Sequence, residues 1–93
     1  RTPTVAIGSP TTLTEATHAG RYLICTANVT LPATSSLGEQ YIILNTSGGN
    51  ITITPDGSTT INGGSGGGAV TVSTFNGVTC IAIGSNNWIA LGV

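Results

Sequence analysis

Trp88 and the two residues before it have the types and spacing that could hold a neutral ligand. Asn86 and Asn87 directly precede Trp88, which is the only tryptophan in the chain. An exposed indole can stack on a sugar ring while neighbouring amides bond the sugar hydroxyls. We therefore take Asn86, Asn87 and Trp88 as the candidate ligand-binding residues. The alternative is that Trp88 is an anchor in the core or at a subunit interface, where the large aromatic residues of small β domains usually lie.

Acid–base or nucleophilic catalysis has few candidate residues. The carboxylates are Glu15, Glu39 and Asp56, and no two of them are close in sequence on a shared face. A glycosidase-like carboxylate pair would have to be built by folding or across subunits. His18 could nominally form a triad with a serine and Asp56, but we interpret it as a turn residue that hydrogen-bonds locally. We predict no catalytic residues and expect that the protein is not an enzyme.

The two cysteines are interpreted as buried free thiols. Cys25 and Cys80 lie 55 positions apart, each inside a strand-like run. Free cysteine is among the most buried residue types, although the spacing leaves a disulfide open. With His18 they fall short of the four ligands of a structural zinc site. The glycine-rich run at 63–68 lacks the lysine and the following helix of a phosphate-binding loop. No metal and no cofactor are expected.

The low charge of the chain excludes several classes of partner. Only five of 93 residues carry a charge, and there is no lysine. Nucleic acid and polybasic membrane docking both require a cluster of Lys and Arg, so neither is expected. No apolar stretch approaches the ~20 residues of a membrane-spanning helix. Polarity comes instead from 17 Thr, 8 Ser, 7 Asn and 14 Gly.

The chain has no Met, so we expect it to be a piece of a longer protein.

The element pattern changes at about residue 11. Residues 1–10 contain two prolines and no sustained period, which predicts an extended linker from an upstream region. Residues 11–93 are predicted to form a single β domain. Its one helical signal lies in residues 11–20, where Thr14 could cap the amides of Ala16 or Thr17 and Gly20 suits the left-handed position after a last turn.

Beyond residue 20 the pattern is that of strands separated by Gly, Asn and Pro. Ile51 and Ile53 alternate with threonines, which is typical of a half-buried strand. The segments 23–25 and 41–44 are apolar on both faces, so we expect another subunit to cover part of them. This predicts a compact antiparallel β-sandwich or barrel-like domain that forms a homotrimer. The predicted strands are 22–26, 28–31, 40–45, 50–54, 69–75, 78–83 and 88–93.

Turn residues predict how these strands connect. Pro55 and Asp56 open a Pro-Asp-Gly-Ser turn, and Asn76-Gly77 is the preferred pair for a two-residue hairpin. Residues 84–87 join the last two predicted strands, so the last three strands should form a meander. The glycine-rich run at 63–68 is interpreted as a loop tip.

Two further patterns are given structural interpretations. The tripeptides Thr2-Pro-Thr and Thr52-Ile-Thr suggest hydroxyl rows of the kind that match an ice lattice, but these require one period along stacked strands. The spacing of the predicted strands is irregular, which argues against such rows. The Asn-x-Ser/Thr triplets at Asn28, Asn45 and Asn50 are expected by chance in a chain this rich in Thr and Ser.

Five short motifs, in this order, resemble a module of bacteriophage tail fibres and tailspikes. The resemblance covers about residues 11–93, and its motifs are Leu-Thr-Glu-Ala-Thr-His-Ala-Gly-Arg-Tyr-Leu-Ile at 13–24, Val-Thr-Leu-Pro at 29–32, Ile-Thr-Ile-Thr-Pro-Asp-Gly at 51–57, Ile-Asn-Gly at 61–63 and Asn-Asn-Trp-Ile-Ala-Leu-Gly at 86–92. Such modules are compact, all-β and usually homotrimeric. The resemblance implies a virion location, attachment to a host-surface polysaccharide or lipopolysaccharide, and help with trimerisation. It supplies no catalytic residues. The alternative is a capsid decoration or head-fibre domain with a purely structural role.

Overall fold

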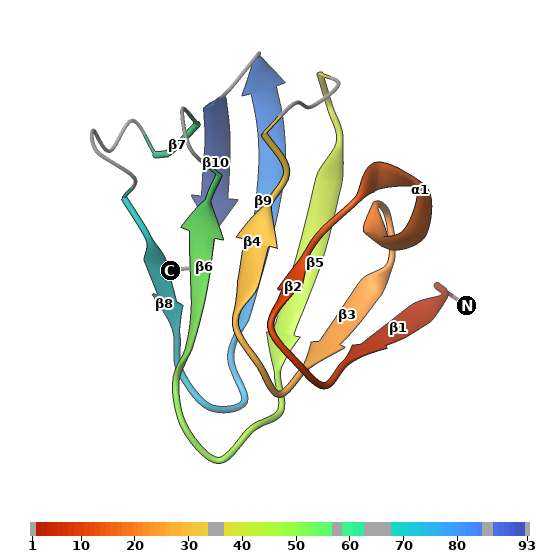
Figure 1. Ribbon diagram of the computed structural model, residues 1–93, viewed down its shortest axis with the longest axis vertical. Helices are drawn as coiled ribbons and strands as arrows, with labels where there is room; N and C mark the ends of the chain where they lie inside the picture. The colour runs from red at the N-terminus through yellow and green to blue at the C-terminus, as the bar shows by residue number, and fades with distance from the viewer. Residues whose placement is uncertain (1, 34–36, 57–58, 63–67, 85–86, 93) are drawn as a thin grey trace.

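Two β-sheets form the computed structural model, which describes residues 2–33, 37–56, 59–62, 68–84 and 87–92. The six-stranded sheet contains, in spatial order, β1 (Thr4–Ile7), β3 (Tyr22–Cys25), β5 (Gln40–Asn45), β9 (Gly77–Gly84), β10 (Asn87–Leu91) and β7 (Thr60–Ile61). The four-stranded sheet contains β2 (Thr11–Thr12), β4 (Val29–Leu31), β6 (Ile51–Pro55) and β8 (Val70–Val72). One helical turn, α1 (Glu15–His18), lies on the same side of the molecule as β1 (Figure 1).

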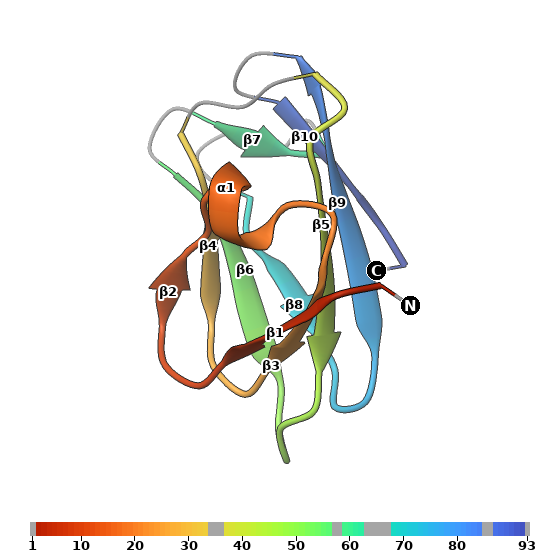
Figure 2. The same cartoon turned by 90° about the vertical axis from the view of Figure 1, so that its right-hand side faces the viewer.

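The first six strands wind back and forth between the two sheets, which form separate layers in Figure 2. From β1 to β6 each strand lies in the opposite sheet from the strand before it, and neighbours within each sheet run parallel. Neighbouring strands are therefore one full turn of the chain apart, as in a flattened β-solenoid. The all-β prediction is confirmed, but the antiparallel arrangement is wrong for this half. Among the described residues, only the pairs β5–β9, β6–β8 and β9–β10 are antiparallel.

The strands keep their register although the connections differ in length. Thr4 pairs with Tyr22 and Thr11 pairs with Val29, an offset of 18 residues in both sheets. The next offset is 20 residues between β3 and β5 but 24 residues between β4 and β6. The sheets therefore impose a regular stacking that the sequence spacing does not show.

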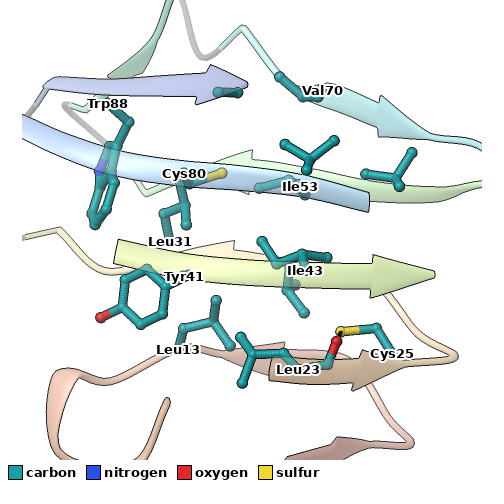
Figure 3. Packing of buried hydrophobic residues seen from close by; sticks show 14 of the residues in the cluster. Leu13, Leu23, Cys25, Leu31, Tyr41, Ile43, Ile53, Val70, Cys80 and Trp88 are labelled. Atoms are coloured by element: carbon teal, nitrogen blue, oxygen red, sulfur yellow. Dashed lines mark hydrogen bonds between the residues drawn. The ribbon is translucent and has the colours of Figure 1, made fainter. Parts of the chain in front are cut away.

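The inward-pointing side chains of both sheets form one core. Inner and outer positions alternate along each strand, as the two-residue period of a β-strand requires. Figure 3 shows Trp88 and Tyr41 towards one end of this core and Cys25 towards the other. The buried apolar residues are Ile7, Leu13, Leu23, Cys25, Val29, Leu31, Tyr41, Ile43, Ile51, Ile53, Ile61, Val70, Val72, Val78, Cys80, Ala82, Trp88 and Ala90.

The segment predicted as a linker contributes to the fold. Residues 4–7 are extended, as expected, but they pair with β3 as an edge strand, and Ile7 is buried. Pro3 lies just before this strand and Pro10 lies just before β2, where a missing N–H costs no ladder hydrogen bond. The boundary at residue 11 therefore does not separate a linker from the β domain.

The helical turn was located correctly, but its predicted cap is wrong. Thr14 makes no side-chain capping bond; its backbone N–H donates instead to Nδ1 of His18, at 2.9 Å. His18 is thereby buried and hydrogen-bonded locally, as predicted. Gly20 has a φ of 70°, which confirms the left-handed residue expected after this turn.

Asn76 and Gly77 do not form the predicted hairpin. β8 pairs with β6 in one sheet and β9 pairs with β5 and β10 in the other, so residues 73–76 carry the chain between sheets. Phe75 lies in this crossover with a φ of 57°, not in a strand. The predicted meander is therefore correct only for β9 and β10.

A turn hydrogen bond lies after β6, one residue later than the predicted Pro-Asp-Gly-Ser turn. Thr59 donates its backbone N–H to the carbonyl oxygen of Asp56, at 2.7 Å. Residues 57–58 of this turn, residues 63–67 of the glycine-rich run, and residues 85–86 of the last connection lie outside the described residues.

Candidate functional site

Trp88 is a core residue rather than an exposed platform. Its side chain is 1% exposed, and its ring lies 5.6 Å from that of Tyr41, centroid to centroid, with an interplanar angle of 46°. A sugar cannot stack on a ring whose faces are covered by the core. The proposed stacking role of Trp88 is therefore wrong in this structure, and the alternative of a core anchor holds.

Of the two asparagines before Trp88, the structure describes one. Asn87 is exposed, and its Oδ1 accepts a hydrogen bond from the hydroxyl of Thr60, at 2.8 Å. This bond links β10 to β7, which gives Asn87 a structural role at the sheet edge. Asn86 lies outside the described residues. The predicted set of Asn86, Asn87 and Trp88 therefore does not form a site around an exposed aromatic ring.

A buried polar pair lies beside Trp88. The hydroxyl of Tyr41 donates to the carboxylate of Glu39, and both side chains are buried. Burial, the hydrogen bond to Glu39, and the negative charges of Glu39 and Glu15 raise the pKa of Tyr41 far above its ordinary value. The indole Nε1 of Trp88 has no hydrogen-bond partner among the described residues. The cluster keeps Tyr41 protonated and gives that end of the core a polar character.

The two other carboxylates lie in different elements. Glu15 is exposed at the start of α1, and Asp56 is half-buried after β6, where its backbone carbonyl accepts the turn bond from Thr59. In the described ranges, no group of three or more His, Cys, Asp or Glu side chains could hold a metal ion. The Gly-Gly-Ser-Gly-Gly run at 63–67 lies outside those ranges.

Both cysteines are buried free thiols, as predicted. Burial raises the pKa of Cys25 to about 11, opposed in part by a hydrogen bond with the backbone of Leu44. Burial alone raises the pKa of Cys80 to about 12. A thiol with such a pKa stays protonated at neutral pH and is a poor nucleophile.

The outward side of the four-stranded sheet carries rows of threonine, which we call the hydroxyl face. Register places Thr12 beside Thr30 and Thr30 beside Thr54, while Thr52 lies beside Thr71 on the next rank. Adjacent strands are ~4.8 Å apart and outward residues along a strand are ~6.7 Å apart, so the hydroxyls form a two-dimensional array. We include Asn28 in the hydroxyl face, because its Oδ1 accepts a hydrogen bond from the backbone N–H of Thr52, at 2.8 Å. The face consists of Thr12, Asn28, Thr30, Thr52, Thr54 and Thr71.

None of the five threonine hydroxyls of this face makes a hydrogen bond to another protein group in the described part of the chain. Thr12, Thr54 and Thr71 are exposed, whereas Thr30 and Thr52 are half-buried. Each hydroxyl supplies one donor and two acceptor positions. The irregular sequence spacing concealed this array, because loops of different length precede strands that stack in register. The alternation of threonine with isoleucine in the Thr52 strand was the signal that could have found it.

The comparisons with known proteins do not assign a family. No protein-family model matches the chain, and no curated protein matches it significantly. None of the described helices is long and apolar enough to cross a membrane. The resemblance to bacteriophage fibre modules therefore stays a prediction from the sequence motifs.

Proposed function

We propose that this chain is a non-catalytic attachment module of a bacteriophage tail fibre or spike, acting as a homotrimer on the virion and outside the host cell. In this proposal it binds a neutral host-surface polysaccharide, or the neutral part of a lipopolysaccharide, through the hydroxyl face. The observation that carries the proposal is the array of free threonine hydroxyls on a stiff sheet. The ordered fibre motifs supply the biological setting.

The chemistry of the hydroxyl face favours a neutral saccharide. Sugar hydroxyls are both donors and acceptors, and threonine hydroxyls can rotate to match either role. Asp56, at the end of β6, is the nearest charged residue in sequence to the threonines of that strand, and the chain carries a net charge of −1. Such a chain has no long-range attraction for an acidic polymer, so binding should depend only weakly on salt.

Trimerisation would compensate for weak individual sites. Hydrogen bonds between neutral groups in water contribute about 1 kcal/mol each, so one array should bind weakly. Three arrays on one particle increase avidity when the polymer can reach them together. This assigns the trimer a functional role in addition to covering apolar surface.

A double variant of the hydroxyl face tests the proposal. Thr30→Val with Thr54→Val removes two adjacent hydroxyls while keeping the branched shape that suits a strand. On an array of neutral and acidic bacterial polysaccharides, we expect the parent to bind neutral polymers. The variant should bind the same polymers with an affinity at least about tenfold lower. The matched control is Thr2→Val with Thr17→Val, two exposed threonines outside the hydroxyl face.

The proposal fails if the double variant binds as well as the parent while both keep the fold and the assembly state. A parent that binds no polysaccharide would favour a structural decoration role on the virion instead.

A further inference from the structure

We infer that the outward side of the six-stranded sheet is the surface through which copies of this chain contact one another. The inference rests on the proposed function only for the number of copies, because the surface itself is defined by the fold. We call it the apolar face. It consists of Tyr22, Ile24, Ile42, Leu44, Ile81, Ile83, Ile89 and Leu91, all half-buried or exposed in the single chain.

These side chains are neighbours across the strands. Register places Tyr22 beside Ile42, then Thr79, then Leu91, in one continuous rank over β3, β5, β9 and β10. Ile81 lies beside Ile89 in the rank above. The cross-strand distance of ~5 Å lets such aliphatic side chains touch. The face is therefore contiguous rather than a scatter of single residues.

A glycine in β9 helps to close the face. Gly77 pairs with Leu44, and a Cβ added to Gly77 would come within 2.9 Å of Leu44 Cδ2. The leucine side chain therefore lies over the glycine backbone. Ile24 lies beside Leu44 on the other side, so the lower rank is also apolar.

The exposure of this face is unusual for an isolated chain. Ile83 and Leu91 are each 52% exposed, and Tyr22 is 39% exposed. Soluble monomers rarely leave a contiguous apolar patch of several hundred Å² in water. The eight residues lie on β3, β5, β9 and β10. Four strands ~4.8 Å apart and about 17 Å long give this part of the sheet a projected area of about 330 Å². A standard interface buries ~800 Å² per partner, so the apolar face would form the centre of an interface whose rim includes neighbouring residues.

The chemistry of the face matches a second copy of itself. The guanidinium of Arg21, the residue before β3, donates to the carbonyl oxygens of Ala16 and Thr17 and so lies against α1. The carboxylate of Glu39 is buried with Tyr41. Among the described residues, no charged side chain lies in the ranks of the face, so copies can approach without like-charge repulsion.

Most polar groups lie at the margins of the apolar face, and one, the half-buried Thr79, lies within it between Ile42 and Leu91. Gln40 lies beside Ile81 at one end of β5, and Thr4 lies at the edge strand beside Tyr22. An apolar centre with a polar rim is the usual arrangement of a protein interface. The hydroxyl face carries threonines at its centre instead. Of the two outward sheet faces, the apolar face is therefore better suited to contact a second copy of the chain.

The assembly state of charged variants tests the inference. Ile83→Lys with Leu91→Lys places two charges on the apolar face at positions exposed enough to tolerate them in a monomer. Thr54→Lys with Thr71→Lys is the matched control, since it adds the same charges to exposed strand positions of the other sheet. Size-exclusion chromatography with light scattering at micromolar concentration should find a trimeric parent, a trimeric control and a monomeric apolar-face variant.

The outcomes separate the inference from the proposed function. A parent oligomer that survives in the apolar-face variant overturns the inference and leaves the homotrimer standing. A monomeric parent overturns both the homotrimer and the inference, without bearing on polysaccharide binding. A parent dimer that only the apolar-face variant dissociates supports the face and overturns the threefold assembly.

Cross-linking covers the case in which the charged variant does not fold. Ile83→Cys adds a thiol on the face, and the native Cys25 and Cys80 are buried and unreactive. A short bismaleimide should link copies of Ile83→Cys in high yield and leave a Thr54→Cys variant largely unlinked. Equal yields from the two variants would overturn the inference.

Discussion

The two sheets of this domain are built by the same alternation and end with opposite outward surfaces. In β6 the outward residues are Thr52 and Thr54, whereas in β5 they include Ile42 and Leu44. Both strands bury isoleucine on the inner side. The inner positions make the sandwich, while the outer positions decide whether a sheet faces water or another protein surface. A strand apolar on both faces, such as β5, therefore leaves apolar side chains on the outward side of its sheet.

The inner surfaces of the sheets differ as well. The six-stranded sheet contributes the groups that can titrate or hydrogen-bond, namely Cys25, Tyr41, Asn45, Cys80 and Trp88. The described inner positions of β4, β6 and β8 hold only Val, Leu, Ile and Pro. Perturbations of the core should therefore act mainly through the six-stranded sheet.

The largest effect is expected from removing the main anchor of that sheet. Trp88→Ala should lower the free energy of unfolding by about 3–5 kcal/mol, because it leaves a cavity at the Tyr41 end of the core. Trp88→Phe keeps a ring against Tyr41 and removes the unpartnered Nε1–H, so it should cost clearly less than Trp88→Ala. Urea unfolding followed by circular dichroism measures all three proteins.

Thr54→Ala is the control on the outward side of the other sheet, where we expect a change within about 0.5 kcal/mol. If Trp88→Ala and Thr54→Ala cost the same, the assignment of Trp88 as a core anchor is wrong.

Much of the strand pattern could be predicted from the sequence. The segment 40–45 was predicted with the bounds it has, because a dense apolar run leaves few alternatives. The helical turn and Gly20 were also located, since their signals are local. Local propensity and alternation therefore located most of the longer strands, but they missed β1, β2 and β7.

The pairing of strands could not be predicted in the same way. Asn76-Gly77 is a strong local hairpin signal, yet the chain crosses between sheets there because β8 completes the edge of the four-stranded sheet. The alternation of threonine in β6 is visible locally, but the array also depends on register between segments separated by loops of unequal length, which the sequence does not show. Trp88 was misjudged because two adjacent asparagines suggest an exposed segment, whereas alternation places every second residue of β10 inside.

A smaller and more gradual effect is expected at high pH, again from the six-stranded sheet. Cys25, Cys80 and Tyr41 all have a raised pKa in the folded protein. The unfolded chain releases these protons first, starting near the ordinary thiol value of 9.0. The contribution of the two thiols to the free energy of unfolding is fully present below about pH 9. It is lost as the pH rises towards their folded pKa values of about 11 and 12. Urea unfolding between pH 7 and pH 11 should show a loss that begins near pH 9.

The variant Cys25→Ala with Cys80→Ala sharpens the pH experiment. It should start from a lower stability at pH 7, because two buried side chains are shortened. Its stability should then fall less between pH 9 and pH 10, before tyrosine ionisation in the unfolded chain becomes important. Parallel pH profiles of the parent and the double variant would contradict the assignment of the early loss to the thiols.

The smallest effect concerns Asn28, which lies just before β4 and bonds to the neighbouring strand β6. Asn28 Oδ1 accepts from the backbone N–H of Thr52 at the start of β6, where the side chain replaces a ladder bond. Asn28→Ala should cost about 1 kcal/mol and speed hydrogen exchange of the Thr52 amide, because that donor loses its protein partner. Asn28→Asp keeps an acceptor and should largely preserve both quantities. Asn50→Ala is the matched control, because Asn50 is an exposed residue just before β6, and it should change neither quantity.

Faster exchange of the Thr52 amide in Asn28→Ala, and not in Asn50→Ala, would show that Asn28 stabilises the hydroxyl face. The threonine hydroxyls of that face would then remain available for a ligand. If the Thr52 amide exchanges equally fast in Asn28→Ala and Asn50→Ala, the Asn28 side chain makes no stabilising bond. The side chains of the hydroxyl face would then contribute nothing to the stability of the fold.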